Sequence, residues 1–319
     1  DVEQLKVLAG EMRQALIQKL SVHGGHVGPN LGMVEATIAM HYVFDSPKDK
    51  MVFDVSHQSY CHKMLTGRAD AFLDEAKYDD VSGYSEPSES AHDFFCIGHT
   101  STSVSLACGL AKARDLADEN YNVIAVIGDG SLSGGEALEG LDFAKELNGN
   151  LIVVVNDNEM SIAENHGGLY ENLKLLRDTK GQAECNIFKA MGLNYVFVED
   201  GNDLTQLIDA FKRVKDSKAP VAVHIHTLKG KGYTLAEENK ESWHWHMPFD
   251  IETGKTKGNY DGGEDYGTLT ADYLLQKMKE DASVVAITSA TPTVFGFTND
   301  KREQAGRQFV DVGIAEEHA

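Results

Sequence analysis

The sequence predicts an α/β protein in which a doubly wound, mostly parallel sheet is followed by the start of a second α/β domain. Two apolar runs, residues 122–130 and 150–158, are rich in β-branched side chains and show no alternation of polar and apolar positions. This pattern is typical of strands that are buried on both faces. A third such run, residues 220–227, follows an amphipathic stretch, and the resulting strand–helix order is that of a doubly wound sheet.

The other elements are predicted from local patterns. Residues 3–20 carry apolar side chains at helical spacing and end at a glycine-rich segment, so they predict an opening helix. Residues 98–116 contain serines and threonines followed by an apolar stretch rich in small residues, which predicts a helix with a Ser/Thr N-cap. The remaining predicted elements are helices at 33–44, 62–76, 135–147, 205–216 and 269–280, and strands at 51–56, 283–290 and 308–315.

The composition divides the chain into three segments. Residues 1–249 contain the strand–helix repeats and are expected to form a complete domain. Residues 250–266 are polar and rich in glycine, which predicts a linker. Apolar patterns resume in residues 267–319, which we interpret as the beginning of an incomplete second domain.

The charge of the chain limits its partners. The 50 acidic and 29 basic side chains give a formal net charge of −21. This charge disfavours nucleic acids, and a phosphate ligand would need a local device such as a metal ion or backbone amides. No apolar run reaches the roughly 20 residues of a membrane helix, and four cysteines without a CxxC pair favour a reducing compartment. We therefore expect a cytoplasmic protein without nucleic-acid or membrane partners.

Polar residues follow two of the predicted strands at adjacent sheet positions. Asp129 lies in a Gly-Asp-Gly sequence after the first strand, and Asn158 closes an Asn-Asp-Asn sequence after the next. A carboxylate, an amide oxygen and a backbone carbonyl would suit Mg²⁺ with a bound phosphate. Either motif alone is more often a simple turn. A nicotinamide dinucleotide site is disfavoured because Ser133 occupies the position that the GxGxxG spacing requires to be glycine.

Nine segments spread over the chain resemble the 1-deoxy-D-xylulose-5-phosphate synthase family, which is similar to transketolases. They are GHVGPNLGMVE, FDSPKDK, FDVSHQSYCHKMLTGR, GYSEPSES, GHTSTSVSLACGLA, GDGSLSGGEALE, NDNEMSI, KGKGYTLAE and IAEEHA. The resemblance implies thiamine diphosphate and Mg²⁺ as cofactors, and a homodimer. It implies decarboxylation of pyruvate and condensation with glyceraldehyde 3-phosphate, which gives a precursor of isoprenoids, thiamine and pyridoxal. Residues 1–249 would then bind the diphosphate, and 267–319 would open the pyrimidine-binding domain.

The resemblance also implies a set of binding residues. Asp129, Asn158 and the carbonyl of Met160 would hold the metal. The residues expected to contact the cofactor are His57, Gly98, His99, Thr100, Gly130, Ser131, Asn158, Tyr233 and Glu316.

Three catalytic residues are implied in the same way. His26 matches a histidine that moves protons, and His244 is a weaker match for which His246 competes. Glu316 corresponds to the glutamate that protonates the aminopyrimidine ring and so promotes formation of the nucleophilic carbanion. Without the resemblance, Glu316 would be interpreted as a solvated residue.

Other interpretations of these side chains remain open. A histidine is most often a surface or satisfied core residue, and zinc pairs at His23/His26 or His244/His246 lack further ligands at regular spacing. Arg68, Lys229 and Lys231 are candidate phosphate-facing charges, although solvated side chains are an equally good interpretation.

The chain departs from the family pattern at several points. Ser56 and Thr100 replace a usual glycine and serine, and both are small enough to preserve the expected site. The stretch between Ile162 and Ala190 is shorter than usual, which makes the substrate less certain than the cofactor. A transketolase that moves a two-carbon ketol unit, and a diphosphate-binding fragment without catalysis, therefore remain as alternatives.

Overall fold

The central sheet is parallel throughout. The structure is a computed structural model that describes residues 1–147, 149–258 and 265–319. Within these residues, five strands pair in the order β1-β2-β3-β5-β4, and Gly128 of β2 is in register with Asn156 of β3. The strands are β1 (Lys50–Phe53), β2 (Val123–Gly128), β3 (Ile152–Asp157), β4 (Asn194–Val198) and β5 (Val221–His226). The predicted doubly wound α/β fold is confirmed.

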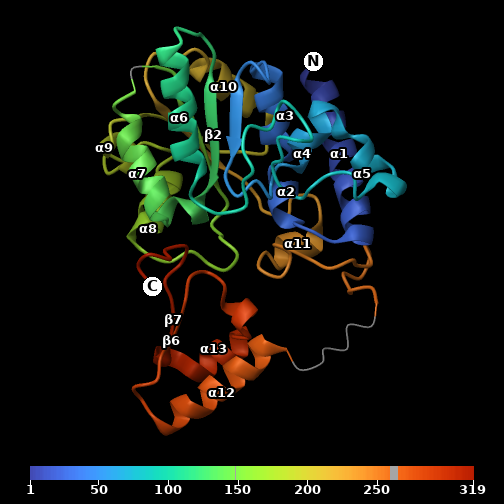
Figure 1. The fold of residues 1–319 in the computed structure, drawn as a ribbon, viewed down its shortest axis with the longest axis vertical. Helices are drawn as coiled ribbons and strands as arrows, with labels where there is room; N and C mark the ends of the chain where they lie inside the picture. The colour runs from blue at the N-terminus through green and yellow to red at the C-terminus, as the bar shows by residue number, and fades with distance from the viewer. Residues whose placement is uncertain (148, 259–264) are drawn as a thin grey trace.

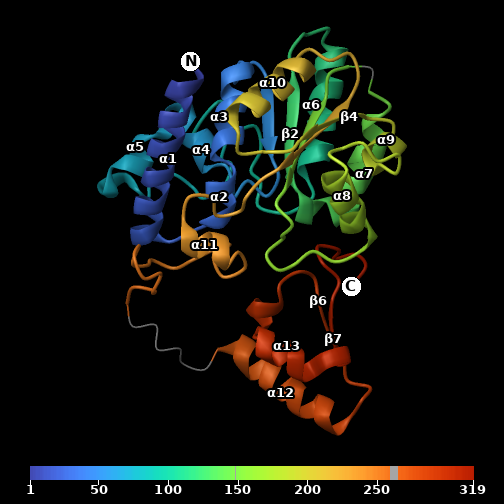
Figure 2. The same cartoon turned by 180° about the vertical axis from the view of Figure 1, so that it is seen from behind.

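Helices cover both faces of the sheet. They are α1 (Val2–His23), α2 (Gly28–Gly32), α3 (Val34–Val43), α4 (Tyr60–Lys63), α5 (Asp70–Leu73), α6 (Ser103–Leu116), α7 (Gly135–Ala144), α8 (Gly168–Asp178), α9 (Ile187–Ala190), α10 (Leu204–Val214) and α11 (Thr234–Glu238). In β2, Ile124 and Val126 enter a core with α1, α3 and α10, whereas Ala125 and Ile127 enter a core with α6, α7 and α8. Figures 1 and 2 show α3 and α6 on opposite sides of β2.

The predicted cap of α6 is wrong in its detail. Thr102 occupies the N-cap position, but its side chain makes no capping hydrogen bond. The carboxylate of Asp54, which follows β1, instead accepts hydrogen bonds from the backbone amides of Ser101 and Ser103 at 3.0 and 2.9 Å. The start of α6 is therefore tied directly to the end of β1, beside the cavity described below.

The C-terminal residues form a smaller α/β unit. It contains α12 (Tyr266–Glu280), β6 (Ala286–Thr288), α13 (Asn299–Ala305) and β7 (Phe309–Asp311), and β6 and β7 are parallel. Its own core is small, and in Figure 1 it lies beyond the carboxyl end of the central sheet. Part of the predicted linker, residues 259–264, lies outside the described residues. Among the helices that the structure describes, none is long and apolar enough to cross a membrane.

Candidate active site

A cavity of about 280 Å³ lies at the carboxyl ends of β1, β2 and β3. Ligands of open parallel sheets bind at this edge. The cavity brings together most of the predicted site residues, namely His26, His57, Gly98, Thr100, Asp129, Gly130, Ser131, Asn158, Met160 and His244. These residues come from segments far apart in the sequence, so the sheet topology places them together.

The three residues expected to hold the metal all line this cavity. Asp129 is 1% exposed, and its Oδ1 atom has no hydrogen-bond partner. Burial, together with the nearby Asp157, raises the pKa of the Asp129 carboxyl well above its usual range. A buried carboxylate is unfavourable unless a proton or a cation compensates it. Asn158 and Met160 line the same cavity, and the Asn158 amide oxygen accepts a hydrogen bond from the Met160 amide at 3.2 Å. The carboxylate, amide and carbonyl oxygens of these three residues are of the types that Mg²⁺ prefers.

The turn after Asp129 approaches the neighbouring chain closely. A Cβ atom at Gly130 would lie 2.6 Å from Cβ of Ser161, so only glycine fits there without a shift. The carbonyl oxygen of Gly130 accepts hydrogen bonds from the hydroxyls of Ser133 and Tyr170, both at 3.1 Å. The turn is therefore fixed while Gly130 and Ser131 line the cavity.

Three histidines cluster at the cavity. The ring centroid of His26 lies 4.8 Å from that of His57 and 5.6 Å from that of His244. Burial, with a smaller effect of Lys229, lowers the pKa of His26 to about 4. Burial also lowers the pKa of His57 and His244 well below the usual value. Burial therefore favours the neutral form of all three imidazoles.

The structure separates His244 from its competitor. His246 stacks on Trp243 with ring centroids 4.3 Å apart, and its Nδ1 atom lies 2.7 Å from the carbonyl oxygen of Met247. His244 lines the cavity, and its Nδ1 atom has no hydrogen-bond partner. Of the two histidines, only His244 lines the cavity.

Three residues expected to contact the cofactor do not line the cavity: Tyr233, His99 and Glu316. Tyr233 donates a hydrogen bond from its hydroxyl to the carbonyl of Ile251 at 2.9 Å and packs against Trp243 and Phe249. Its side chain is therefore committed to an aromatic cluster. The side chain of His99 is 72% exposed and does not line the cavity, whereas its neighbours Gly98 and Thr100 do.

The C-terminal unit closes one side of the cavity. Ile314 lines it, and its carbonyl accepts a hydrogen bond from the Ser133 hydroxyl at 2.7 Å. The carboxylate of Glu316 lies 3.9 Å from Nε2 of His99 and is 45% exposed. Glu316 is therefore near the cavity, at the side where the two units meet, but it does not line the described wall.

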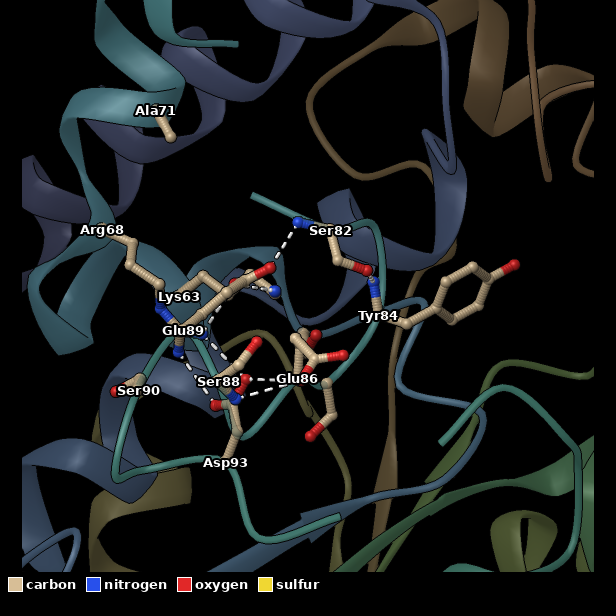
Figure 3. Close-up of polar contacts among 12 residues, drawn as sticks. Lys63, Arg68, Ala71, Ser82, Tyr84, Glu86, Ser88, Glu89, Ser90 and Asp93 are labelled. Atoms are coloured by element: carbon tan, nitrogen blue, oxygen red, sulfur yellow. Dashed lines mark hydrogen bonds and ion pairs between the residues drawn. The ribbon is translucent and has the colours of Figure 1, made fainter. Parts of the chain in front are cut away.

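One wall of the cavity comes from a long segment with little regular structure, residues 79–101. Its carboxylates Glu89 and Asp93 form ion pairs with Lys63 and Arg68, and we call these four residues the charged cluster. Figure 3 shows the cluster, with Glu89 and Asp93 also turned toward backbone amides of their own segment. The cluster therefore fastens the segment to the helices that follow β1.

The structure also resolves the other open interpretations. Among the described residues, no group of three or more His, Cys, Asp or Glu side chains could hold a metal, so the zinc pairs gain no support. Lys229 is 1% exposed and lines the cavity, whereas Arg68 is committed to the charged cluster. Lys231 does not line the cavity. Burial lowers the pKa of Lys229 to about 8.

Several lining residues were not singled out from the sequence. Asp54, Gln58 and Tyr84 line the cavity. The ring of Tyr84 packs edge-to-face with that of His26, with ring centroids 6.0 Å apart. Asp54 and Gln58 lie close in sequence to His57, near the end of a predicted strand. Their position at this strand end could therefore have identified them as candidates. Tyr84 had no such signal because its segment lacks a periodic pattern.

The central parallel sheet and its helices superpose on solved transketolases, which places the chain in the transketolase-like class of folds. The crystal structure of a transketolase from Campylobacter jejuni superposes with a TM-score of 0.61 at 21% identity, over 76% of this chain and 40% of that one. A transketolase structure from Pichia stipitis gives 0.58 at 17% identity, over 98% and 61%. At these identities the similarity shows the fold alone.

Sequence comparison defines the family. The family model described as 1-deoxy-D-xylulose-5-phosphate synthase matches residues 1–184 and 176–227. Curated synthases of that name from Geobacter sulfurreducens and Listeria monocytogenes are each 42% identical, over 99% and 100% of this chain. The chain belongs to the 1-deoxy-D-xylulose-5-phosphate synthase family. It spans about half the length of these relatives, 55% and 53% respectively.

The comparison agrees with the short stretch after Ile162. The alignment with the Geobacter sulfurreducens protein extends over 353 residues, more than the 319 residues of this chain, so that relative contains residues that are absent here. The family match divides into two segments at residues 176–184, within the stretch expected to be short. In the structure, α8 and α9 occupy this stretch.

Proposed function

We propose that this chain carries the thiamine diphosphate and Mg²⁺ site of a 1-deoxy-D-xylulose-5-phosphate synthase. The observation that carries the proposal is the buried Asp129 carboxylate, which has an unpartnered Oδ1 atom and lies in the same cavity as Asn158 and Met160. The chain has a net charge of −21, so a diphosphate needs a compensating cation. A magnesium ion held by these three residues supplies that cation.

The remaining lining residues are assigned by their position relative to this metal site. The backbone of Gly130 and Ser131 would lie against the diphosphate, and His57, Gly98 and Thr100 would line the rest of the cofactor pocket. When bound, thiamine diphosphate supplies a carbon nucleophile and accepts the electrons left by decarboxylation of pyruvate. His99 and Tyr233 stay as predictions from the resemblance.

Proton transfer falls to the residues around the cavity. Neutral His26 and His244 can exchange protons with substrate groups in the cavity. Glu316, from the unit that closes the cavity, would hold a proton against the aminopyrimidine ring. The C-terminal unit brings Glu316 to the same side of the cavity as His99, which supports this role.

Replacing His244 by alanine is expected to lower turnover with pyruvate by about 10²–10⁴-fold, the usual contribution of a general acid or base. Replacing His246 by alanine is expected to cost about 1 kcal/mol of folding stability through its lost stacking on Trp243, with turnover changed less than about threefold. Carbon dioxide release and chemical denaturation measure the two effects. Equal losses of turnover in the two variants would contradict the assignment of His244.

The proposed reaction joins pyruvate and glyceraldehyde 3-phosphate with loss of carbon dioxide to give 1-deoxy-D-xylulose 5-phosphate. The alternative is a transketolase reaction between a ketose phosphate and an aldose phosphate. The test supplies each pair of substrates and follows carbon dioxide and sugar phosphates by mass spectrometry. Carbon dioxide release that requires pyruvate supports the synthase, and ketol transfer without it supports the transketolase.

A binding module without catalysis is the candidate from another class. The chain spans about half the length of its curated relatives, and its C-terminal unit has a small core, so the chain alone could bind the cofactor without turnover. Binding of thiamine diphosphate with neither reaction would identify this case. By family resemblance we also propose a cytoplasmic homodimer.

A further inference from the structure

We infer that Asn165 is a positioning residue that orients the Asp129 carboxylate for the metal ion, an inference that rests on the proposed function. The side-chain amide nitrogen of Asn165 donates a hydrogen bond to Oδ2 of Asp129 at 2.7 Å. The other oxygen, Oδ1, has no partner. One carboxylate oxygen is therefore held, and the second is left for a ligand.

A tight turn after β3 brings Asn165 to this position. Met160 and Glu164 form an antiparallel bridge, and the amide of Ser161 donates to the carbonyl of Ala163 at 3.0 Å. Lys229 donates from Nζ to the carbonyl of Ser161 at 2.7 Å. The turn that carries the expected metal ligand Met160 therefore also delivers Asn165 to Asp129.

Asn165 contacts Asp129 without being part of the lining of the main cavity. It does not line that cavity, but it lines a second cavity of about 330 Å³ to which Asp129 also contributes. Asn165 can therefore act on the metal site through the carboxylate of Asp129. This geometry distinguishes its role from those of Asn158 and Met160, which face the main cavity.

The chemistry of the amide suits this role. A lysine or arginine at the same place would neutralise Asp129 and compete with the metal, whereas an amide fixes the carboxylate without removing its charge. The Oδ1 atom of Asn165 is buried without a partner, so the orientation of the side chain depends on its bond to Asp129. Removing this bond is expected to weaken metal binding by about 10–100-fold, as for other residues that orient a ligand.

The test measures binding of Mn²⁺, a paramagnetic substitute for Mg²⁺, by electron paramagnetic resonance in the presence of thiamine diphosphate. Asn165→Ala is compared with Glu164→Ala, which removes an exposed neighbour on the same turn. We expect Mn²⁺ affinity to fall about 10–100-fold in Asn165→Ala and to change less than about twofold in Glu164→Ala. Asn165→Leu, which keeps the volume and lacks the hydrogen bond, repeats the test if the alanine variant unfolds.

Asp129→Ala is measured in parallel, so that a failure of the proposed role of Asn165 can be distinguished from a failure of the proposed metal site. Loss of Mn²⁺ binding in Asp129→Ala with unchanged affinity in both Asn165 variants would overturn the role of Asn165 and leave the metal site intact. Unchanged affinity in Asp129→Ala would overturn both. Thermal unfolding without metal, unchanged in a variant that loses affinity, shows that the effect is on the site.

Discussion

Replacing Asp129 by alanine is expected to weaken Mg²⁺-dependent binding of thiamine diphosphate by at least about 100-fold. Loss of a residue that only orients a metal ligand usually lowers metal affinity by about 10–100-fold, so loss of the carboxylate ligand itself should lower the affinity at least as much. Isothermal titration calorimetry with and without Mg²⁺ measures the effect. In the wild-type chain, omission of Mg²⁺ should cause a loss of similar size, whereas the variant should respond little to Mg²⁺.

A substitution of Asp129 that removes the charge but keeps the shape is expected to stabilise the unliganded chain. The Asp129 carboxylate is 1% exposed with an unpartnered oxygen, so without metal it is a cost to folding. Asp129→Asn, which keeps the shape, should therefore unfold at the same temperature as the wild type or at a higher one. Asp209→Ala, an exposed carboxylate on α10, is the control and should change neither binding nor unfolding. A marked loss of stability in Asp129→Asn would contradict this account.

Replacing Asp93 by alanine is expected to destabilise the chain by about 3–5 kcal/mol, because it leaves the buried Arg68 guanidinium without its main partner. Two hydrogen bonds of 2.8 and 2.9 Å join the two side chains, and Asp93 also accepts one from the backbone amide of Glu86 at 2.9 Å. Residues 79–101 depend on this anchor and supply part of the cavity wall. Cofactor affinity should therefore fall with stability. Urea denaturation and calorimetry measure the two effects.

Two further measurements check the prediction for Asp93: the pH dependence of folding stability, and the effect of breaking an exposed ion pair. Burial opposes ionisation of Asp93, but hydrogen bonds from His62 and Arg68 hold its pKa well below the usual 3.8. A depressed pKa stabilises the fold above about pH 4 and loses this effect as the pH falls further. The difference in the free energy of unfolding between the wild type and Asp93→Asn should therefore become smaller below about pH 4. Asp70→Ala, which breaks an exposed pair with Lys77, should leave stability nearly unchanged; an equal loss there would refute the special role of Asp93.

The sheet was predictable because its central strands are apolar on both faces. Their continuous β-branched runs are typical of strands that are buried on both faces. Strand β4 was missed because it lies at the edge of the sheet and is mostly half-buried, so its sequence lacks that run. The cap of α6 was mispredicted because the capping group, Asp54, is 49 residues from Ser103. Local preference for a Ser/Thr cap could not show this long-range bond.

The site was predictable where its residues follow strand ends or match family segments. Asp129 and Asn158 were placed together by the parallel sheet, because neighbouring strands end at one edge. Tyr233 matches a family segment, but its hydroxyl bonds to Ile251 rather than facing the cavity. Asn165 had no signal, because its role depends on one hydrogen bond across 36 residues. Contacts of this kind depend on three-dimensional packing rather than on local pattern.

A crystal structure of the chain grown with Mg²⁺ and thiamine diphosphate would test the proposed metal site most directly. We expect a magnesium ion bound to a carboxylate oxygen of Asp129, the amide oxygen of Asn158 and the carbonyl oxygen of Met160. We also expect the diphosphate to lie against the backbone of Gly130 and Ser131, with Asn165 still bonded to Asp129. A cofactor bound elsewhere, or a metal ion that does not contact Asp129, would contradict the proposed site.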